Sequence, residues 1–328
     1  MRRKLSLAFL ILAVSVTGFL LLRSVFAPPL KVTMILSGSA TDGSFGAQAV
    51  AGLHRAQETL NVKTEYLECG NSPLNHLPNL AAAAARSDFI ICVGSPLSEH
   101  LTAAAEANPR LKFAIIDGIA SAPNIVSVFF RANESSYLAG ALAAELTPPN
   151  QPVGIVIGCA LPIMKDVQTG FEAGAKSVRP DVQILTDVVG SWQDPAGGAR
   201  CALSQRERGA HVIFQAAGGS GIGVIESAAK GQFLAIGCDM PQDSLAPCCV
   251  PASAVKRADT VVCDLIKAAT QNTLPLGKIL SLGINEGAVG LEWNTQPGNA
   301  IVPAEVKARI NALSSAVRSG ELKVPSAF

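Results

Sequence analysis

Residues 181–239 read DVQILTDVVGSWQDPAGGARCALSQRERGAHVIFQAAGGSGIGVIESAAKGQFLAIGCD. Three apolar runs in this stretch each end in turn residues, namely 182–189, 211–214 and 233–236. Segments with helical spacing, roughly 195–208 and 223–230, separate these runs. Strands that alternate with helices predict right-handed crossovers and therefore a parallel sheet.

The ends of the three predicted strands carry side chains that suit a ligand. In such sheets, ligands bind beyond the carboxyl ends of the strands. The ends here offer an aromatic ring, Trp192, a glycine-rich turn with Gly218 and Gly219, and a carboxylate, Asp239. This set fits a small, flat, hydroxylated ligand. The alternative is that Trp192 belongs to the core and the glycines only turn the chain.

The same alternation of strands and helices begins at residue 31, changes character at Arg131 and then restarts. We therefore predict two doubly wound α/β lobes with a cleft between them, since 328 residues suffice for two cores. The predicted first lobe holds residues 29–129 and about 250–280. The predicted second lobe holds residues 130–249 and about 281–328.

The amino terminus has the pattern of an export signal. Met-Arg-Arg-Lys precedes an apolar run over residues 5–22, and Arg23 follows. Residues 25–27 fit a cleavage site, but Pro28 would follow the cut, and the run is near the length that spans a bilayer. Residues 1–28 are thus a signal peptide or a membrane anchor. We place the rest in the periplasm or at the cell exterior.

Composition argues against several function classes. With 26 Lys and Arg against 25 Asp and Glu, and no basic stripe, nucleic acid is not an expected partner. The eight cysteines match no zinc-site spacing, and their pairing stays open. No Gly-x-Ser-x-Gly elbow occurs, and the four histidines are scattered, so we expect them on the surface. We predict no enzyme, no cofactor and no metal site.

Several motifs recur in an order typical of one known family. They are FAIIDG (113–118), YLAG (137–140), GFEAGA (170–175), GSWQDP (190–195), VIFQAAGG (212–219) and SGELKVP (319–325). With these motifs the chain resembles the basic membrane protein family of extracytoplasmic substrate-binding proteins, which serve ABC importers. The resemblance implies the type I periplasmic binding protein fold, a nucleoside-like ligand and an ABC permease as partner. The alternative function is a membrane-anchored sensor of small molecules without a transport role.

The resemblance also implies roles for particular residues. The first loop, DGSFG (42–46), resembles the family's Asp-Lys-Ser-Phe-Asn, with Gly46 in place of the asparagine. Further positions match the family's ligand-facing acid, aromatic residue, ribose-binding acid and lysine, namely Asp117, Trp192, Asp239 and Lys256. The sugar side of the site is thus kept and the base side altered.

These roles are chemically reasonable. A carboxylate accepts both hydroxyls of a ribose diol, and Lys256 can offset Asp117 and Asp239, which are predicted to come from opposite lobes. Phe45, Trp192 and Phe214 are candidates to sandwich a ring, although Phe214 can equally be core. The full set of predicted ligand-binding residues is Asp42, Phe45, Asp117, Trp192, Phe214, Gly218, Gly219, Asp239 and Lys256.

Overall fold

The computed structural model describes residues 28–70, 72–297 and 301–328. The prediction of a signal peptide or anchor rests on residues 1–27, which lie outside the described residues. Within the described ranges, no helix has both the length and the apolar character needed to cross a membrane.

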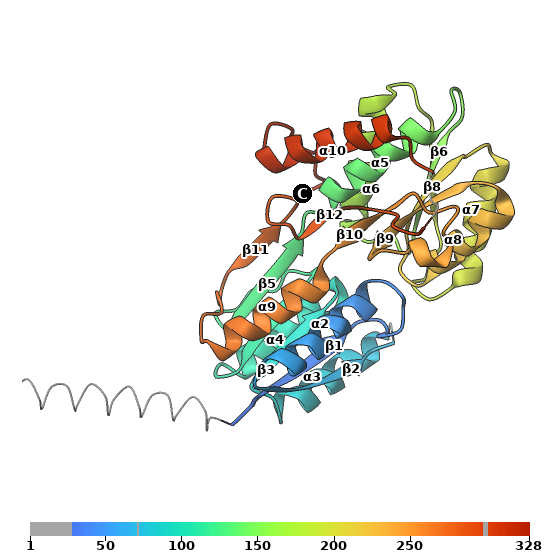
Figure 1. Cartoon of the computed structure of the whole chain (residues 1–328). Helices are drawn as coiled ribbons and strands as arrows, with labels where there is room; N and C mark the ends of the chain where they lie inside the picture. Colours follow the sequence, from blue (N-terminus) through green and yellow to red (C-terminus); the bar gives the residue numbers. More distant parts are fainter. Residues whose placement is uncertain (1–27, 71, 298–300) are drawn as a thin grey trace, which may run out of the picture.

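Two lobes, each built on a six-stranded sheet, make up the described chain (Figure 1). The first sheet is wholly parallel and has the order β11-β5-β4-β3-β1-β2. Its strands are β1 (Leu30–Leu36), β2 (Val62–Glu68), β3 (Phe89–Val93), β4 (Lys112–Ile116), β5 (Ile125–Phe130) and β11 (Ile279–Leu282). β1 and β3 are buried along most or all of their length, because helices cover both faces of a parallel sheet.

The second sheet repeats this order as β12-β10-β9-β8-β6-β7. Its strands are β6 (Val153–Ile157), β7 (Ile184–Val188), β8 (Val212–Ala216), β9 (Leu234–Asp239), β10 (Ala252–Lys256) and β12 (Val289–Trp293). The three apolar runs of the opening stretch form β7, β8 and β9. β7 and β8 are not neighbours, since β6 lies between them. Among the strand pairs of this sheet in the described residues, only the pair of β10 and β12 is antiparallel. The strand order reverses between β1 and β3 in the first sheet and between β6 and β8 in the second. In such sheets, ligands bind at the point where the order reverses.

Helices cover the sheets of both lobes. Those of the first lobe are α2 (Phe45–Thr59), α3 (His76–Ala84), α4 (Ser98–Ala107) and α9 (Ala258–Thr270). Those of the second are α5 (Ala132–Leu146), α6 (Pro162–Val178), α7 (Pro195–Glu207), α8 (Ser220–Gly231) and α10 (Ala304–Ser319). α5 and α6 pack so closely that a Cβ on Gly170 would lie 2.2 Å from the carbonyl oxygen of Asn133.

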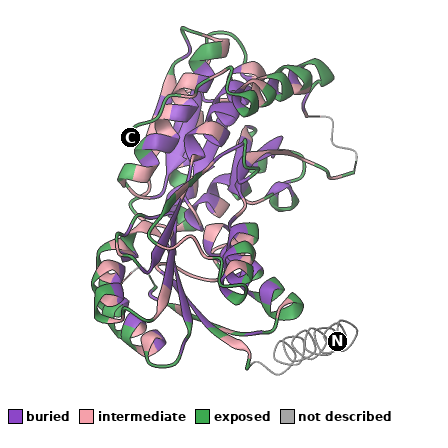
Figure 2. Ribbon diagram, turned by 90° about the vertical axis from the view of Figure 1, so that its left-hand side faces the viewer, coloured by how far each residue is buried: buried purple, intermediate pink, exposed green. Residues whose placement is uncertain are grey.

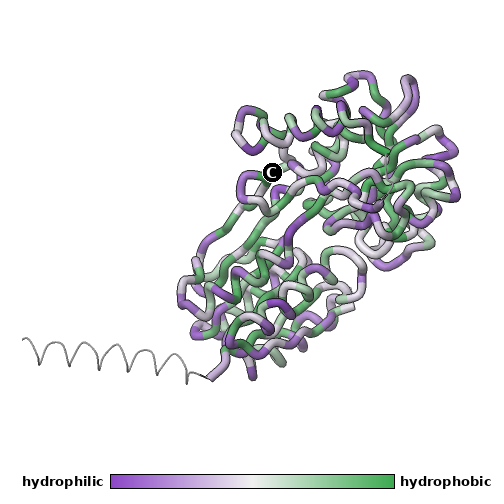
Figure 3. Tube along the Cα trace, in the orientation of Figure 1, coloured by the Kyte–Doolittle hydropathy of each residue, from purple (hydrophilic) through white to green (hydrophobic). Residues whose placement is uncertain are grey.

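The core of each lobe lies along its strands. Buried residues line the sheets and the inward faces of the helices, while exposed residues occupy the outer helix faces (Figure 2). The hydropathy of the chain follows the same division, with apolar segments along the strands (Figure 3). This burial is the main force that holds each lobe together.

One predicted lobe boundary is wrong. We predicted residues 250–280 in the first lobe, but β10 pairs with β9 and β12 in the second sheet. All five residues of β10 are buried, so this short apolar strand completes a sheet after the proline-rich turn that precedes it. The chain returns to the first lobe only at Arg257, after which α9 packs beside α2 (Figure 1).

The chain crosses between the lobes between β5 and α5, between β10 and α9, and between β11 and β12. Backbone hydrogen bonds tie these crossings to one another. Arg131 donates its N–H to the Leu282 oxygen, and Arg257 donates to the Ala288 oxygen, both at 2.8 Å. The Arg131 side chain also pairs with Glu134 and Glu286, at 2.6 and 2.7 Å. These contacts hold together the segments that connect the two lobes.

Candidate functional site

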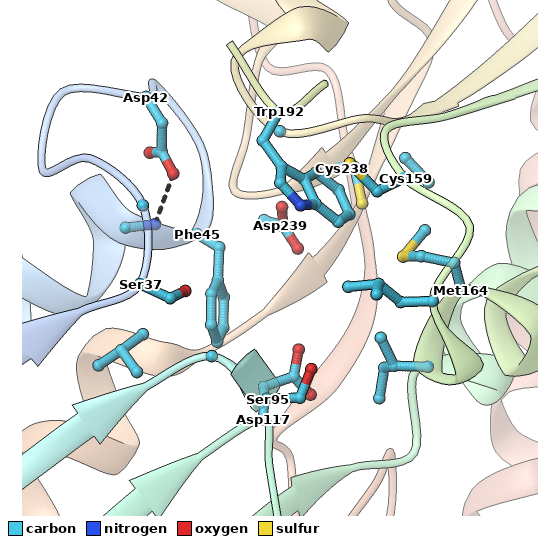
Figure 4. A pocket seen from close by; sticks show the side chains of 18 of the residues that line it. Ser37, Asp42, Phe45, Ser95, Asp117, Cys159, Met164, Trp192, Cys238 and Asp239 are labelled. Carbon is cyan, nitrogen blue, oxygen red and sulfur yellow. Dashed lines mark hydrogen bonds between the residues drawn. The ribbon is translucent and has the colours of Figure 1, made fainter. Parts of the chain in front are cut away.

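A cavity of about 450 Å³ lies where the carboxyl ends of the two sheets face each other. Figure 4 shows Asp42, Phe45 and Asp117 from the first lobe opposite Trp192 and Asp239 from the second. The volume falls within the range of pockets that bind small molecules. The fold therefore places the predicted residues around one space, as expected for strands that end at facing sheet edges.

Two acids of the cavity have unusual backbone conformations. Asp117 directly follows β4 and has a φ of 58°, and Asp239 ends β9 with a φ of 66°. Residues other than glycine rarely adopt positive φ, and such strain is found where the surroundings hold a functional group in place. Both side chains face the cavity from opposite lobes (Figure 4).

Lys256 bridges the two acids. Its Nζ lies 2.8 Å from Asp117 Oδ2 and 3.8 Å from Asp239 Oδ1. Burial lowers the pKa of Lys256, but the carboxylates of Asp117 and Asp239 outweigh burial and hold the pKa above its usual value. The lysine therefore stays charged. Asp117 Oδ1 is buried with no hydrogen-bond partner in the described residues, and such an atom is costly unless a ligand pairs with it.

Aromatic side chains form two walls of the cavity. Phe45 begins α2, packs edge-on against Phe130 at 6.3 Å between ring centroids, and has Lys256 Nζ 5.0 Å from its ring centroid. Across the cavity, the ring of Trp192 packs so closely on Gly158 that a Cβ there would lie 2.3 Å from it. Phe214 is fully buried and stacks on Phe171, so it is mainly a core residue that reaches the cavity wall.

Asp42 acts on its own loop. Its carboxylate oxygens accept hydrogen bonds from the backbone N–H groups of Ser44, Gly46 and Ala47, each at 2.9 Å. Burial raises the pKa of Asp42, and these three bonds oppose that rise. Asp42 thus caps α2 and shapes the first loop. Gly46 is required there, because a Cβ at this position would lie 2.1 Å from the carbonyl oxygen of Ser39.

Hydrogen bonds join the two lobes beside the cavity. Ser44 Oγ donates to Asp239 Oδ2, and Gln242 Nε2 donates to the Gly43 oxygen at 3.1 Å. Both bonds join the first loop of one lobe to the second lobe. The Lys256–Asp117 pair is a third polar contact between the two lobes at this cavity.

The structure brings most of the predicted residues to this cavity. Asp42, Phe45, Asp117, Trp192, Phe214, Gly218, Asp239 and Lys256 line it. Gly219 does not line it and instead precedes the first residue of α8.

Sequence reasoning missed several lining residues, among them Ser37, Ser95 and Cys159. The expectation of surface histidines is wrong for His76, which is 2% exposed, lines the cavity and packs against His100. Ser37 is the first residue after β1 and Ser95 the second after β3, so both could have been found as residues at strand ends. In the described part of the chain, no cluster of three or more His, Cys, Asp or Glu side chains could hold a metal ion.

Residues 30–327 match the family described as "ABC transporter substrate-binding protein PnrA-like". The chain is 33% identical over 305 residues to "Basic membrane protein A" of Borreliella burgdorferi, an alignment that covers 90% of this chain and 88% of the relative. It is 28% identical over 321 residues to "ABC transporter nucleoside-binding protein BmpA" of Lactococcus lactis, which covers 90% and 89%.

The fold also matches solved structures of solute-binding proteins from ABC transporter systems. One from Aeropyrum pernix has a TM-score of 0.81 and 26% identity, over 90% of this chain and 94% of that chain. One from Conexibacter woesei has a TM-score of 0.74 and 23% identity, over 91% and 99%. The two lobes are thus those of a type I periplasmic binding protein. The chain belongs to the PnrA-like family of ABC transporter substrate-binding proteins.

Proposed function

We propose that this substrate-binding protein takes up a nucleoside in the cavity between its lobes and presents it to an ABC permease. The observation that carries the proposal is the arrangement of Asp117, Asp239 and Lys256. Asp117 Oδ1 is buried without a partner among the residues that the structure describes, while its other oxygen is held 2.8 Å from the lysine. A ribose hydroxyl is a donor of the right kind for that oxygen.

The remaining walls suit the nucleobase. Phe45 and Trp192 line the cavity on opposite sides, and offset stacking on aromatic rings stabilises a flat heterocycle. The Lactococcus lactis relative is named as nucleoside-binding, and the alignment with it covers the residues of both lobes. This relationship favours a carrier over the alternative of a sensor without a transport role.

The site is proposed to bind its ligand without transforming it, because the family consists of substrate-binding proteins. Such proteins act outside the cytoplasm. We propose that residues 1–28 direct export and hold part of the population at the membrane. Amino-terminal sequencing of the protein from the membrane fraction and from the membrane-free fraction tests this, and a uniform start at Pro28 in both would exclude an anchor.

A thermal-shift screen of residues 28–328 against nucleosides, free bases and sugars tests the proposed ligand class. A nucleoside at 100 times its dissociation constant should stabilise the fold by about 2.7 kcal/mol. Chromatography of the recovered ligand separates the rival functions, because a carrier returns the nucleoside intact and an enzyme does not. No shift with any nucleoside would refute the proposal.

A further inference from the structure

Three polar side chains line the first-lobe end of the cavity and hold neither the Asp117–Asp239–Lys256 cluster nor the first loop, in which the lining residue Ser39 is bonded to Thr41 and Glu68. Ser37 follows β1, Ser95 follows β3, and His76 begins α3 after β2. β1 and β3 are the strands between which the order of the sheet reverses. Figure 4 shows Ser37 and Ser95 on the first-lobe side.

His76 is held in a defined position. Its ring is 2% exposed and meets the ring of His100 edge-on, with 5.0 Å between centroids and 3.4 Å between the two Nδ1 atoms. Burial lowers the pKa of His76, and the neighbouring His100 lowers it further, so the ring is neutral at pH 7. Since Nδ1 is engaged by His100, Nε2 is the ring nitrogen left for a ligand.

The tautomer of His76 is free to change. A contact between two Nδ1 atoms needs one donor and one acceptor, and either ring can supply the proton. If His100 donates, Nε2 of His76 carries a proton and donates. If His76 donates through Nδ1, its Nε2 accepts. The hydroxyls of Ser37 and Ser95 can likewise donate or accept.

The first loop leaves the edge of a base without a partner. Asp42 is occupied by backbone N–H groups, and Gly46 has no side chain and no space for one. If Asp117 and Asp239 hold the sugar, the polar groups left on the first-lobe wall are Ser37, His76 and Ser95. We propose that these three side chains, the adaptable subsite, hydrogen-bond the edge of the nucleobase. This inference rests on the proposed nucleoside function.

The adaptable subsite determines which bases are accepted. A site with fixed donors or acceptors rejects a base that presents the wrong group, because its own polar atoms are left unpaired. Groups that can switch between donor and acceptor impose little such penalty. Both amino and oxo bases are therefore bound, with affinities for adenosine, guanosine, inosine and uridine that lie within about tenfold of one another.

Calorimetry with these four nucleosides tests the subsite, using the wild type, His76→Leu and the double variant S37A/S95A. Each variant should lose about five- to tenfold in affinity for inosine and adenosine alike, the effect of a neutral hydrogen bond. His76→Gln keeps a donor and an acceptor and should retain most of the affinity. His54→Leu, at an exposed position of α2, is the matched control and should change nothing.

The outcomes separate this inference from the proposed function. If the wild type binds nucleosides but His76→Leu and S37A/S95A bind them equally well, the subsite is wrong and the function stands. A preference above about a hundredfold for one base in the wild type also overturns the subsite. If no nucleoside binds the wild type, both the adaptable subsite and the proposed function are refuted. Melting curves identify a variant that fails to fold, in which case the other variant decides.

Discussion

At the residue scale, the site depends on a buried charge cluster that is incomplete without a ligand. Lys256 contacts Asp117 closely and Asp239 at longer range, and side-chain exposure of each is about a tenth. Asp239 also accepts from Ser44, while Asp117 Oδ1 has no partner in the described residues. This asymmetry identifies Asp117 as the acid with most to gain from a bound hydroxyl.

Asp117→Asn should therefore weaken nucleoside binding while the fold survives. The amide keeps the shape of the side chain but loses the charge that strengthens its hydrogen bond to a hydroxyl. The expected loss is about 1.5–3 kcal/mol, the range for a hydrogen bond to a charged group. Titration calorimetry measures it, with Asp181→Asn on the exposed surface as the control. Equal affinity in the wild type and Asp117→Asn would remove Asp117 from the binding site.

Lys256→Met should reduce the free energy of unfolding by about 3–5 kcal/mol, because it leaves two buried carboxylates without their cation. The folded-state pKa of Lys256 is raised, so its contribution is complete below the unfolded-state pKa of about 10.4 and is lost as the pH rises through the folded value. Denaturant unfolding should show that the free energy of unfolding of the wild type exceeds that of the variant by a constant amount from about pH 7 to 9. This excess should shrink at pH values above the unfolded-state pKa of lysine. A difference that already shrinks between these pH values would contradict this role.

At the element scale, the periodicity of the sequence predicted the strands and helices, because apolar runs and turn residues mark them locally. Pairing between strands is not local. The residues of β10 carry no sign of which sheet they join, so their lobe was predicted wrongly. The same limit applies to His76, since only the packing of α3 against α4 brings it to His100 and the cavity.

The first loop shows how an element constrains the site. Gly46→Asn would introduce the asparagine that the family resemblance implies here, but its Cβ would collide with the Ser39 carbonyl oxygen. We expect a loss of about 1–3 kcal/mol in stability and weaker nucleoside binding, because the loop and the start of α2 must shift. Thermal melting and calorimetry measure both effects. A stable Gly46→Asn protein with sharper base selectivity would show that the loop can accommodate the side chain.

The carboxyl-terminal residues join the lobes on the side away from the first loop. Ser326 and Ala327 donate hydrogen bonds to Asp166 on α6, at 2.7 and 2.8 Å, and the ring of Phe328 packs against Phe129 on β5. Deletion of residues 325–328 leaves Asp166, which is fully buried, without these donors. The deletion should cost about 1–3 kcal/mol of stability in chemical denaturation. The variant Phe328→Ala keeps both hydrogen bonds to Asp166 and should lose less stability than the deletion. Equal losses of stability in the two variants would show that the ring of Phe328, and not the hydrogen bonds, provides the effect.

At the scale of the whole molecule, two sheets with the same strand order face each other across the cavity. The repeat of the strand–helix pattern after Arg131 predicted the two lobes, and the family motifs predicted several residues of the cavity wall. What they could not predict are the contacts between the lobes, which join distant segments such as Ser44 with Asp239 and Gln242 with Gly43. Contacts of this kind depend on the folded arrangement and leave no local pattern in the sequence.

The central claim is that the acids of the cavity bind the hydroxyls of a nucleoside. Calorimetry with inosine and 2′,3′-dideoxyinosine, on the wild type and on Asp117→Ala, tests it as a double-mutant cycle. Loss of the hydroxyls should lower the affinity of the wild type by about 10- to 100-fold, and that of Asp117→Ala by less than about threefold. An equal loss in both proteins would contradict the account, because the hydroxyls would then bind elsewhere.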